Sequence, residues 1–411
     1  MANQMQTQAP EGAQDVSLGY LRAFLVLLVI AHHVATAYAG LLPGPADAFP
    51  VSSHGQIWGA FPVVAAQHSP IFAIFLALND TFFMSLLFLL SGVFVMRSIR
   101  RRGALGFAGA RIFRLGVPFL IGAVFLGPLA YVPAYLQITG GGTLTDFANR
   151  WITTPNLSPG PVWFLWLLLA FDLGAALLSL VWKGWAGALG RLLPDGSRRP
   201  VRFFGVMMLL SAAAYIPMAA TFGSQHWTMG LFNVQISRVL QYALYFMVGV
   251  ALGACDLERS LLSTTGGLAR GWWVWLLSGL LAPVVGGAVV VGAASAKGLD
   301  APIREIIGGV GFVYLCVALC FAFLALFLRF VRKPNPVMNS LQAHSFGIYL
   351  VHYVFVNWVN YALLGPDLPA AAKFAIAFFG AAGLSWATAV VGSRLLGGGR
   401  RRERQLSLAH A

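Results

Sequence analysis

Two ionisable residues in the first long apolar segment have a spacing that could serve chemistry. Arg22 and His33 lie in the stretch LRAFLVLLVIAHHVATAY, residues 21–38. On an α-helix, eleven residues return to within about 20° of the starting face and rise about 16 Å. A neutral histidine can act as a general base, and a guanidinium can bind an anion. The pair therefore predicts one helix face that is polar at two depths.

This polar face is not expected to point toward lipid, because exposing ionisable groups to lipid is costly. Such side chains usually line a cavity or pack against polar partners inside a helix bundle. A purely structural interpretation is also open: Arg22 would extend to the membrane interface, and His32 and His33 would bond to neighbouring helices. The placement of Arg22 and His33 on one stripe favours the cavity.

A pair of arginines follows in ARIFRLGVP, residues 110–118. Arg111 and Arg114 are three residues apart, so on a helix they share a face. Two neighbouring guanidinium groups suit phosphate. The phosphate could belong to a phosphorylated ligand or to lipid headgroups, and the sequence leaves both possibilities open.

Three more polar residues interrupt apolar segments. Asp172 in WFLWLLLAFDLGA is expected to meet an arginine, a histidine or a bound substrate, because an unpaired carboxylate there is costly. It could orient an imidazole. His352 in SFGIYLVHYVF could be a second base or bind substrate. Ser91, beside Gly92, could support a site or mark a tight helix contact. For Asp172 and His352, a structural hydrogen bond between helices is the alternative.

The composition predicts the kind of fold that positions these residues. The 411 residues are 58% hydrophobic and 10% charged, whereas soluble domains carry about 25% charge. A membrane-spanning helix needs about 20 apolar residues. We therefore predict an all-α polytopic membrane protein with a bundle of about ten transmembrane helices. They are expected near residues 18–39, 79–97, 112–135, 162–183, 203–222, 236–254, 272–294, 305–330, 341–361 and 371–396.

The basic residues give this bundle a direction. With the N-terminus placed in the cytoplasm, all but five of the 27 Lys and Arg residues lie on the cytoplasmic side, as the positive-inside rule requires. The five on the outer side are Arg150, Arg238, Lys297, Arg304 and Lys373. Both termini are thus expected to be cytoplasmic, with a disordered tail at 1–17 and a basic tail at 397–411 around one membrane domain at 18–396.

The same distribution excludes other classes of partner. The net charge of +14 sits in short segments between apolar runs, so no nucleic-acid partner is expected. The three cysteines form no metal-binding pattern, so no metal is expected. The Gly- and Ala-rich helices and the use of Arg over Lys suggest a high-GC bacterium. We expect an integral protein of the bacterial cytoplasmic (inner) membrane, in contact with membrane lipid.

Five segments together resemble the acyltransferase 3 family of integral-membrane acyltransferases. They are YLRAFLVLLVIAHH, FFMSLLFLLSGVF, ARIFRLGVP, GPVWFLWLLLAFD and SFGIYLVHYVF. The residues that match the family patterns are Arg22, His33, Ser91, Arg111, Arg114, Trp163, Tyr349 and His352. The likeness extends over about residues 18–396. Ala23 stands where the family usually has glycine.

The resemblance implies an O-acyltransferase. It would move an acyl group, usually acetyl, from acyl-CoA to a hydroxyl of a cell-envelope glycan, a lipid or a small molecule, with acyl-CoA as co-substrate and no resident cofactor. Arg22 and His33 would be catalytic, and Arg111 and Arg114 would bind the donor. The supporting or substrate-binding residues would be Ser91, Trp163, Tyr349 and His352, to which the residue analysis adds Asp172.

Two further points follow from the sequence. The extracytoplasmic esterase-like domain that is fused to some family members is not expected in this chain, so transfer to an outer acceptor could require a separate protein. The main alternative is a secondary transporter that uses His33, Asp172 and Arg22 as a proton or substrate relay. Transporters often contain internal repeats, and the sequence shows none.

Overall fold

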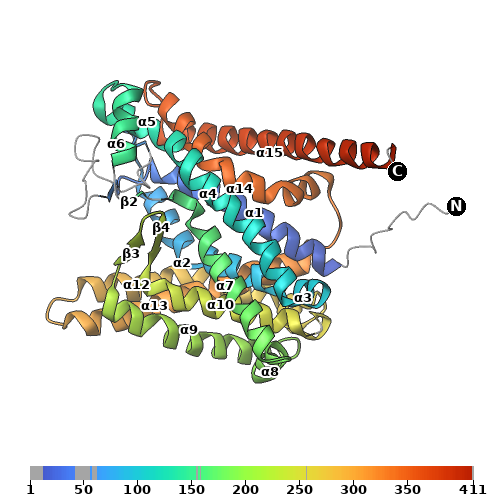
Figure 1. Ribbon diagram of the computed structural model, residues 1–411. Helices are drawn as coiled ribbons and strands as arrows, with labels where there is room; N and C mark the ends of the chain where they lie inside the picture. Colours follow the sequence, from blue (N-terminus) through green and yellow to red (C-terminus); the bar gives the residue numbers. More distant parts are fainter. Residues whose placement is uncertain are drawn as a thin grey trace.

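The computed structural model describes residues 13–41, 56–57, 63–153, 156–157, 159–255 and 257–409. Long helices form almost all of this part of the chain, which confirms the all-α prediction (Figure 1). The strands are short: β1 (Gln56–Ile57) pairs in parallel with β2 (Asn156–Leu157), and β3 (His226–Met229) forms a hairpin with β4 (Phe232–Gln235).

Fifteen α-helices make up most of the described chain. They are α1 (Ala13–Thr36), α2 (Pro70–Val93), α3 (Val95–Arg111), α4 (Val117–Ile121), α5 (Gly127–Thr139), α6 (Leu144–Thr153), α7 (Trp163–Val181), α8 (Trp185–Leu192), α9 (Pro200–Phe222), α10 (Ile236–Ala254), α11 (Gly267–Arg270), α12 (Trp272–Ser295), α13 (Ala301–Phe330), α14 (Pro336–Ala362) and α15 (Ala370–Ala409). Two π-helical turns, Ile112–Gly116 and Gly122–Leu126, join the end of α3 to α4 and α5 in one continuous helical segment.

Nine helical segments within the described residues are long and apolar enough to cross a membrane. The predicted span at 341–361 is not among these nine; it corresponds to α14, which has 27 residues but contains several polar ones. Near its start, the hydroxyl of Tyr20 donates to Asn339 Oδ1 at 2.5 Å; near its end, the hydroxyl of Tyr38 donates to Asn360 Oδ1 at 2.9 Å. Because Tyr20 lies in the first half of α1 and Tyr38 lies just beyond its end, α14 runs beside α1 over the same thickness.

Several helices extend beyond their predicted bounds, among them α1, α2 and α15. Helix α1 begins at Ala13, inside the predicted tail, and residues 1–12 lie outside the described residues. Helix α2 begins at Pro70 rather than at 79, since proline suits a first helical turn. Asp80 is therefore inside a helix, where it pairs with Arg238 of α10 at 2.6 Å. Helix α15 continues to Ala409, through most of the predicted basic tail.

The two ends of the bundle differ in what they carry. The start of α1, the end of α15, α3 and α8 lie at one end, here named the α3 side, and the β-strands and α6 lie at the other (Figure 1). The first and last helices thus begin and end on the same side, as an even number of crossings requires. The positive-inside rule predicts that the α3 side faces the cytoplasm.

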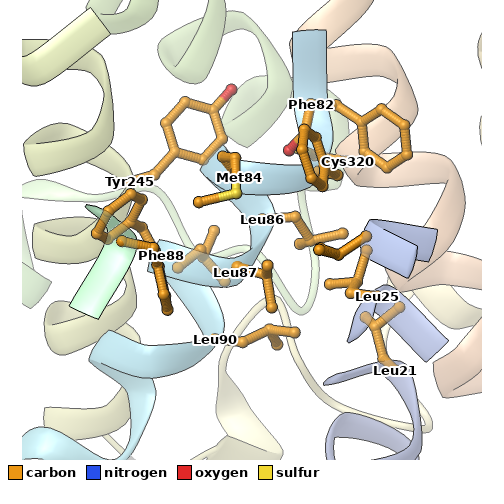
Figure 2. Close-up of a cluster of buried hydrophobic side chains, with 14 of the residues drawn as sticks. Leu21, Leu25, Phe82, Met84, Leu86, Leu87, Phe88, Leu90, Tyr245 and Cys320 are labelled. Carbon is orange, nitrogen blue, oxygen red and sulfur yellow. The ribbon is translucent and has the colours of Figure 1, made fainter. Parts of the chain in front are cut away.

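The core is centred on α2. Figure 2 shows side chains of α2, among them Leu87 and Phe88, packed with Leu21 and Leu25 of α1 and with Tyr245 of α10, and all five are buried. Such contacts supply the dispersion energy that holds helices together in lipid. This core fixes α1 against α2, and so sets the height of each polar residue on α1.

Glycines bring α2 and α10 into backbone contact. A Cβ on Gly92 would overlap the carbonyl oxygen of Phe246, and a Cβ on Gly249 would overlap that of Leu89. Small residues at such crossings let two helices approach closely. The Ser91-Gly92 pair is therefore part of a tight helix contact, one of the two interpretations that the sequence allowed.

Candidate functional site

An arginine-lined cavity lies on the α3 side of the bundle. Its volume is about 420 Å³, within the range of small-molecule sites. Its wall contains six arginines and the rings of Phe94 and Phe107, and none of its lining residues in the described chain is acidic. The six arginines are Arg22, Arg97, Arg101, Arg102, Arg111 and Arg114. The structure thus brings together the three arginines that the sequence singled out and adds three more.

A single glycine gives α3 the shape that forms this cavity. Gly103 has φ 73° and ψ 164°, a conformation open almost only to glycine. Nothing lies within 4 Å of the place where its Cβ would be, so glycine is needed for backbone conformation rather than for space. The helix is divided into a first leg, residues 95–102, and a second leg, residues 104–111. Both legs contribute arginines to the cavity.

An ion pair fixes the second leg of α3 against α7. The distance from Arg111 Nε to Asp172 Oδ2 is 3.1 Å, and the side chain of Asp172 is only 1% exposed. The pair has no hydrogen-bond geometry, and neither carboxylate oxygen has a hydrogen-bond partner within the described chain. Arg111 also lies over the ring of Phe107, 5.0 Å from its centroid. Of the partners expected for Asp172, the structure selects an arginine, and the suggestion that it orients an imidazole is wrong.

Arg22 enters the same cavity from α1. Its guanidinium carbon lies 5.7 Å from the centroid of the Phe94 ring. Its Nε is buried and has no hydrogen-bond partner among the described residues. A buried donor without a partner is costly. An anionic ligand in this cavity would supply the hydrogen-bond acceptor that Arg22 Nε lacks.

His33 lies higher on α1, among aromatic rings. Its Nδ1 is 2.8 Å from the carbonyl oxygen of Val29. Because a carbonyl oxygen only accepts, Nδ1 carries the proton and Nε2 keeps the lone pair. The ring centroids of His352 and Tyr353 are each 5.2 Å from that of His33. The tautomer leaves His33 able to accept a proton at Nε2.

His352 has the same arrangement on α14. Its Nδ1 lies 2.5 Å from the carbonyl oxygen of Tyr349, and its Nε2 is buried with no hydrogen-bond partner in the described part of the chain. A void of about 10 Å³ lies beside it, lined in part by Tyr349 and Tyr353, close to the size that one water needs. His33 and His352 therefore form an imidazole pair with two basic nitrogens.

The imidazole pair and the arginine cavity each contain one residue of α1, at different heights. Arg22 and His33 both belong to α1, and eleven residues of α-helix rise about 16 Å. The predicted polar stripe thus has an arginine-lined end on the α3 side and an imidazole end toward the opposite side.

The comparison with protein families identifies the family of the chain. A family model described as an acyltransferase domain, Acyl_transf_3, matches residues 15–390. The chain belongs to the acyltransferase 3 family. With nine apolar helices in its described part, this acyltransferase is an integral membrane protein. No curated protein and no solved structure matches the chain.

The remaining predicted residues support the acyltransferase fold around the two places. The Ser91 hydroxyl donates to the carbonyl oxygen of Leu87 at 2.8 Å. Trp163 packs on Tyr242, with centroids 5.8 Å apart. The Tyr349 hydroxyl donates to the carbonyl oxygen of Pro161, which ties α14 to the start of α7. Of these three residues, Tyr349 alone reaches the imidazole pair, through its contact with His352.

Four residues around these two places are not predicted from the sequence: Arg97, Arg101, Arg102 and Tyr353. In the sequence the three arginines stand out only as positive charges on the cytoplasmic side. A signal is present for them, because the short segment RSIRRRG concentrates four arginines. For Tyr353 the signal was its position next to His352.

Proposed function

We propose that this acyltransferase moves an acyl group, in particular acetyl, from acyl-CoA to a hydroxyl group of a cell-envelope glycan, lipid or small molecule. It would do so as an O-acyltransferase of the bacterial cytoplasmic membrane. The observation that carries the proposal is the cavity with six arginines, joined by a single helix to an imidazole pair. One end is suited to the phosphates of a donor and the other to the proton transfer of an acyl transfer.

The charge of the cavity supports acyl-CoA as the donor. Coenzyme A carries a diphosphate and a 3′-phosphate, and arginine binds such groups with short, charge-assisted hydrogen bonds. Arg22, Arg111 and Arg114 would hold the donor at the α3 side. Acyl-CoA would thus be a co-substrate, and the proposal requires no resident cofactor.

The position of α1 gives a route for the acyl end. With its phosphates at Arg22, the pantetheine arm would extend along the polar stripe toward His33, over the rise of about 16 Å that eleven helical residues give. The arm is a flexible chain of amides and methylenes, so it suits a path between packed helices. The thioester would then meet the imidazole pair.

The lone pair of His33 Nε2 supports general-base catalysis. Nε2 takes the proton of the acceptor hydroxyl while the hydroxyl oxygen attacks the thioester carbonyl carbon. The tetrahedral intermediate then collapses, the C–S bond breaks, and the departing thiolate takes the proton from the imidazolium. The products are an ester and coenzyme A, and His33 returns to its neutral form.

His352 would bind the acceptor or serve as a second base. Its Nε2 is buried and has no partner within the described residues, and its ring lies 5.2 Å from that of His33. A hydroxyl between the two rings could contact both nitrogens. Tyr349 would position His352, because its backbone carbonyl oxygen accepts the hydrogen bond from His352 Nδ1.

The test uses the whole protein purified in nanodiscs. We would measure binding of radiolabelled acetyl-CoA, and release of free thiol with water as the acceptor, for wild type, His33→Ala and Arg111→Ala/Arg114→Ala. We expect loss of binding in the double arginine variant, and retained binding with loss of thiol release in the histidine variant. Binding that persists unchanged without both arginines, or thiol release that persists without His33, would contradict the proposal.

Two matched substitutions control for general damage. His344 is another histidine of α14, but its Nδ1 meets the Ser340 carbonyl oxygen at 2.7 Å and its Nε2 meets Ser393 Oγ at 3.0 Å. Arg100 lies between the cavity arginines in sequence, and it donates instead to the Ala254 carbonyl oxygen at 2.9 Å. His344→Ala and Arg100→Ala should leave both binding and thiol release near the wild-type values.

A further inference from the structure

Three of the cavity arginines have no task in the proposed reaction. Arg97, Arg101 and Arg102 lie on the first leg of α3, on the other side of the Gly103 turn from Arg111. They differ from the inner residues in exposure: the side chain of Arg97 is 74% exposed and that of Arg111 is 23% exposed. The first leg therefore forms the outer rim of the cavity.

The rim arginines are poorly matched by acidic residues of the chain itself. Arg97 lies 3.8 Å from Asp15, a distance at which an exposed pair contributes little. For Arg101 and Arg102 no acidic partner is found within the described residues. Like charges held side by side repel one another, so this rim is stabilised by an anion of high charge.

The covalent order of coenzyme A decides which phosphate reaches the rim. The thioester has to point toward His33, so the diphosphate that follows the pantetheine arm lies near Arg22 and Arg111. The ribose with its 3′-phosphate comes after the diphosphate, and so lies farther from His33. The phosphate at the far end of the donor therefore meets the first leg of α3.

We propose that Arg101 and Arg102, assisted by Arg97, bind the 3′-phosphate of coenzyme A. They would make the enzyme select acyl-CoA over thioesters of dephospho-CoA and over acyl groups carried on protein-bound pantetheine, which both lack this phosphate. The inference rests on the proposed function, because it assigns the outer part of the same donor. Its new content is the selectivity and the residues that produce it.

The first test compares two donors that differ only in the 3′-phosphate. kcat/KM is measured with acetyl-CoA and with acetyl-dephospho-CoA, for wild type and for Arg101→Ala/Arg102→Ala in nanodiscs. We expect wild type to prefer acetyl-CoA, and the ratio of the two values to fall by about ten- to a hundredfold in the variant, the size expected for lost hydrogen bonds to a charged group. The control Arg100→Ala removes a neighbouring positive charge outside the cavity and should keep the wild-type ratio.

The second test needs no turnover. Adenosine 3′,5′-bisphosphate and ADP are compared as competitors of bound acetyl-CoA; the first carries the 3′-phosphate and the second does not. Wild type should bind the bisphosphate better, and the Arg101→Ala/Arg102→Ala variant should lose this preference.

The outcomes separate the two proposals. If wild type binds and turns over acetyl-CoA but its donor ratio is the same in the rim variant, the 3′-phosphate assignment is overturned and the proposed function stands. If Arg100→Ala lowers the ratio as much as the rim variant does, the effect is general electrostatics, and the assignment is overturned as well. If wild type neither binds nor turns over either thioester, the proposed function fails and the assignment fails with it.

Discussion

Arg111 and Asp172 form an ion pair of 3.1 Å that joins α3 to α7 beneath the arginine cavity. The carboxylate is buried and has no other charged partner in the described chain, whereas the guanidinium also lines the cavity. One residue thus both pairs with a buried carboxylate of the bundle and faces the cavity. Substitution of Arg111 will therefore change two properties, and they can be separated by changing Asp172 as well.

Arg111→Ala should lower stability, and Asp172→Asn should restore it. Removing the guanidinium leaves a buried carboxylate without a counter-charge, which costs about 3 kcal/mol or more. The double variant Arg111→Ala/Asp172→Asn has no such charge. Thermal unfolding in detergent should show a lower Tm for Arg111→Ala and partial recovery in the double variant. Equal Tm values for both variants would show that the pair carries no coupling.

Donor affinity should not recover in that double variant. Arg111 supplies the cavity with a guanidinium, which Asp172→Asn does not replace. The KM for acetyl-CoA should therefore stay raised in Arg111→Ala/Asp172→Asn while its Tm recovers. A KM that returned to the wild-type value would place the role of Arg111 in folding alone.

His33→Ala should affect turnover and spare donor binding. Loss of a general base lowers kcat by about 10²- to 10⁴-fold. The arginine cavity, where we propose that the phosphates bind, is about 16 Å away along α1, so the Kd for acetyl-CoA should change little. Steady-state kinetics and equilibrium binding on the same preparation check both values. A large rise in Kd with unchanged kcat would move His33 from chemistry to binding.

Gly103→Ala should disrupt the cavity. Alanine is strained at φ 73°, and a residue held in such a conformation costs about 1–3 kcal/mol. The chain can relieve this strain by changing the turn, which separates the two legs of α3 and weakens acetyl-CoA binding. Gly109→Ala is the matched control: Gly109 lies in the second leg with helical backbone angles and nothing within 4 Å of its Cβ position. It should keep wild-type binding and stability, and equal effects of the two substitutions would argue against the turn.

Gly249→Ala should damage the contact between α2 and α10. The added methyl would overlap the Leu89 carbonyl group, so the helices have to move apart. We expect a fall in Tm and in the yield of folded protein on size-exclusion chromatography. Gly292→Ala on α12 serves for comparison, since nothing lies within 4 Å of its Cβ position. A Gly249→Ala variant as stable as Gly292→Ala would contradict the close packing.

Regular helix geometry made much of this arrangement predictable. Arg22 and His33 could be placed on one face because α1 is continuous from Ala13 to Thr36. The span at α14 could be recognised despite its polar residues, because the apolar positions between them still suited a helix. These predictions needed only local periodicity.

The features that escaped prediction depend on tertiary structure. The segment after Arg102 has glycines at 103, 106 and 109, and of these three only Gly103 takes a positive φ. Sequence alone does not say which glycine turns the chain, and so it could not gather six arginines around one cavity. Likewise, the partner of Asp172 is set by how α3 packs on α7, and no local pattern encodes that contact.

The continuity of α1 has an energetic consequence under the proposed function. The nucleotide stays at one end of the helix, and the acyl group alone reaches the other end. The free energy of the thioester, made by cytoplasmic metabolism, would then drive ester formation on the opposite face of the bilayer. That compartment would need no activated metabolite of its own, and the carrier would be recovered on the side where it is recharged.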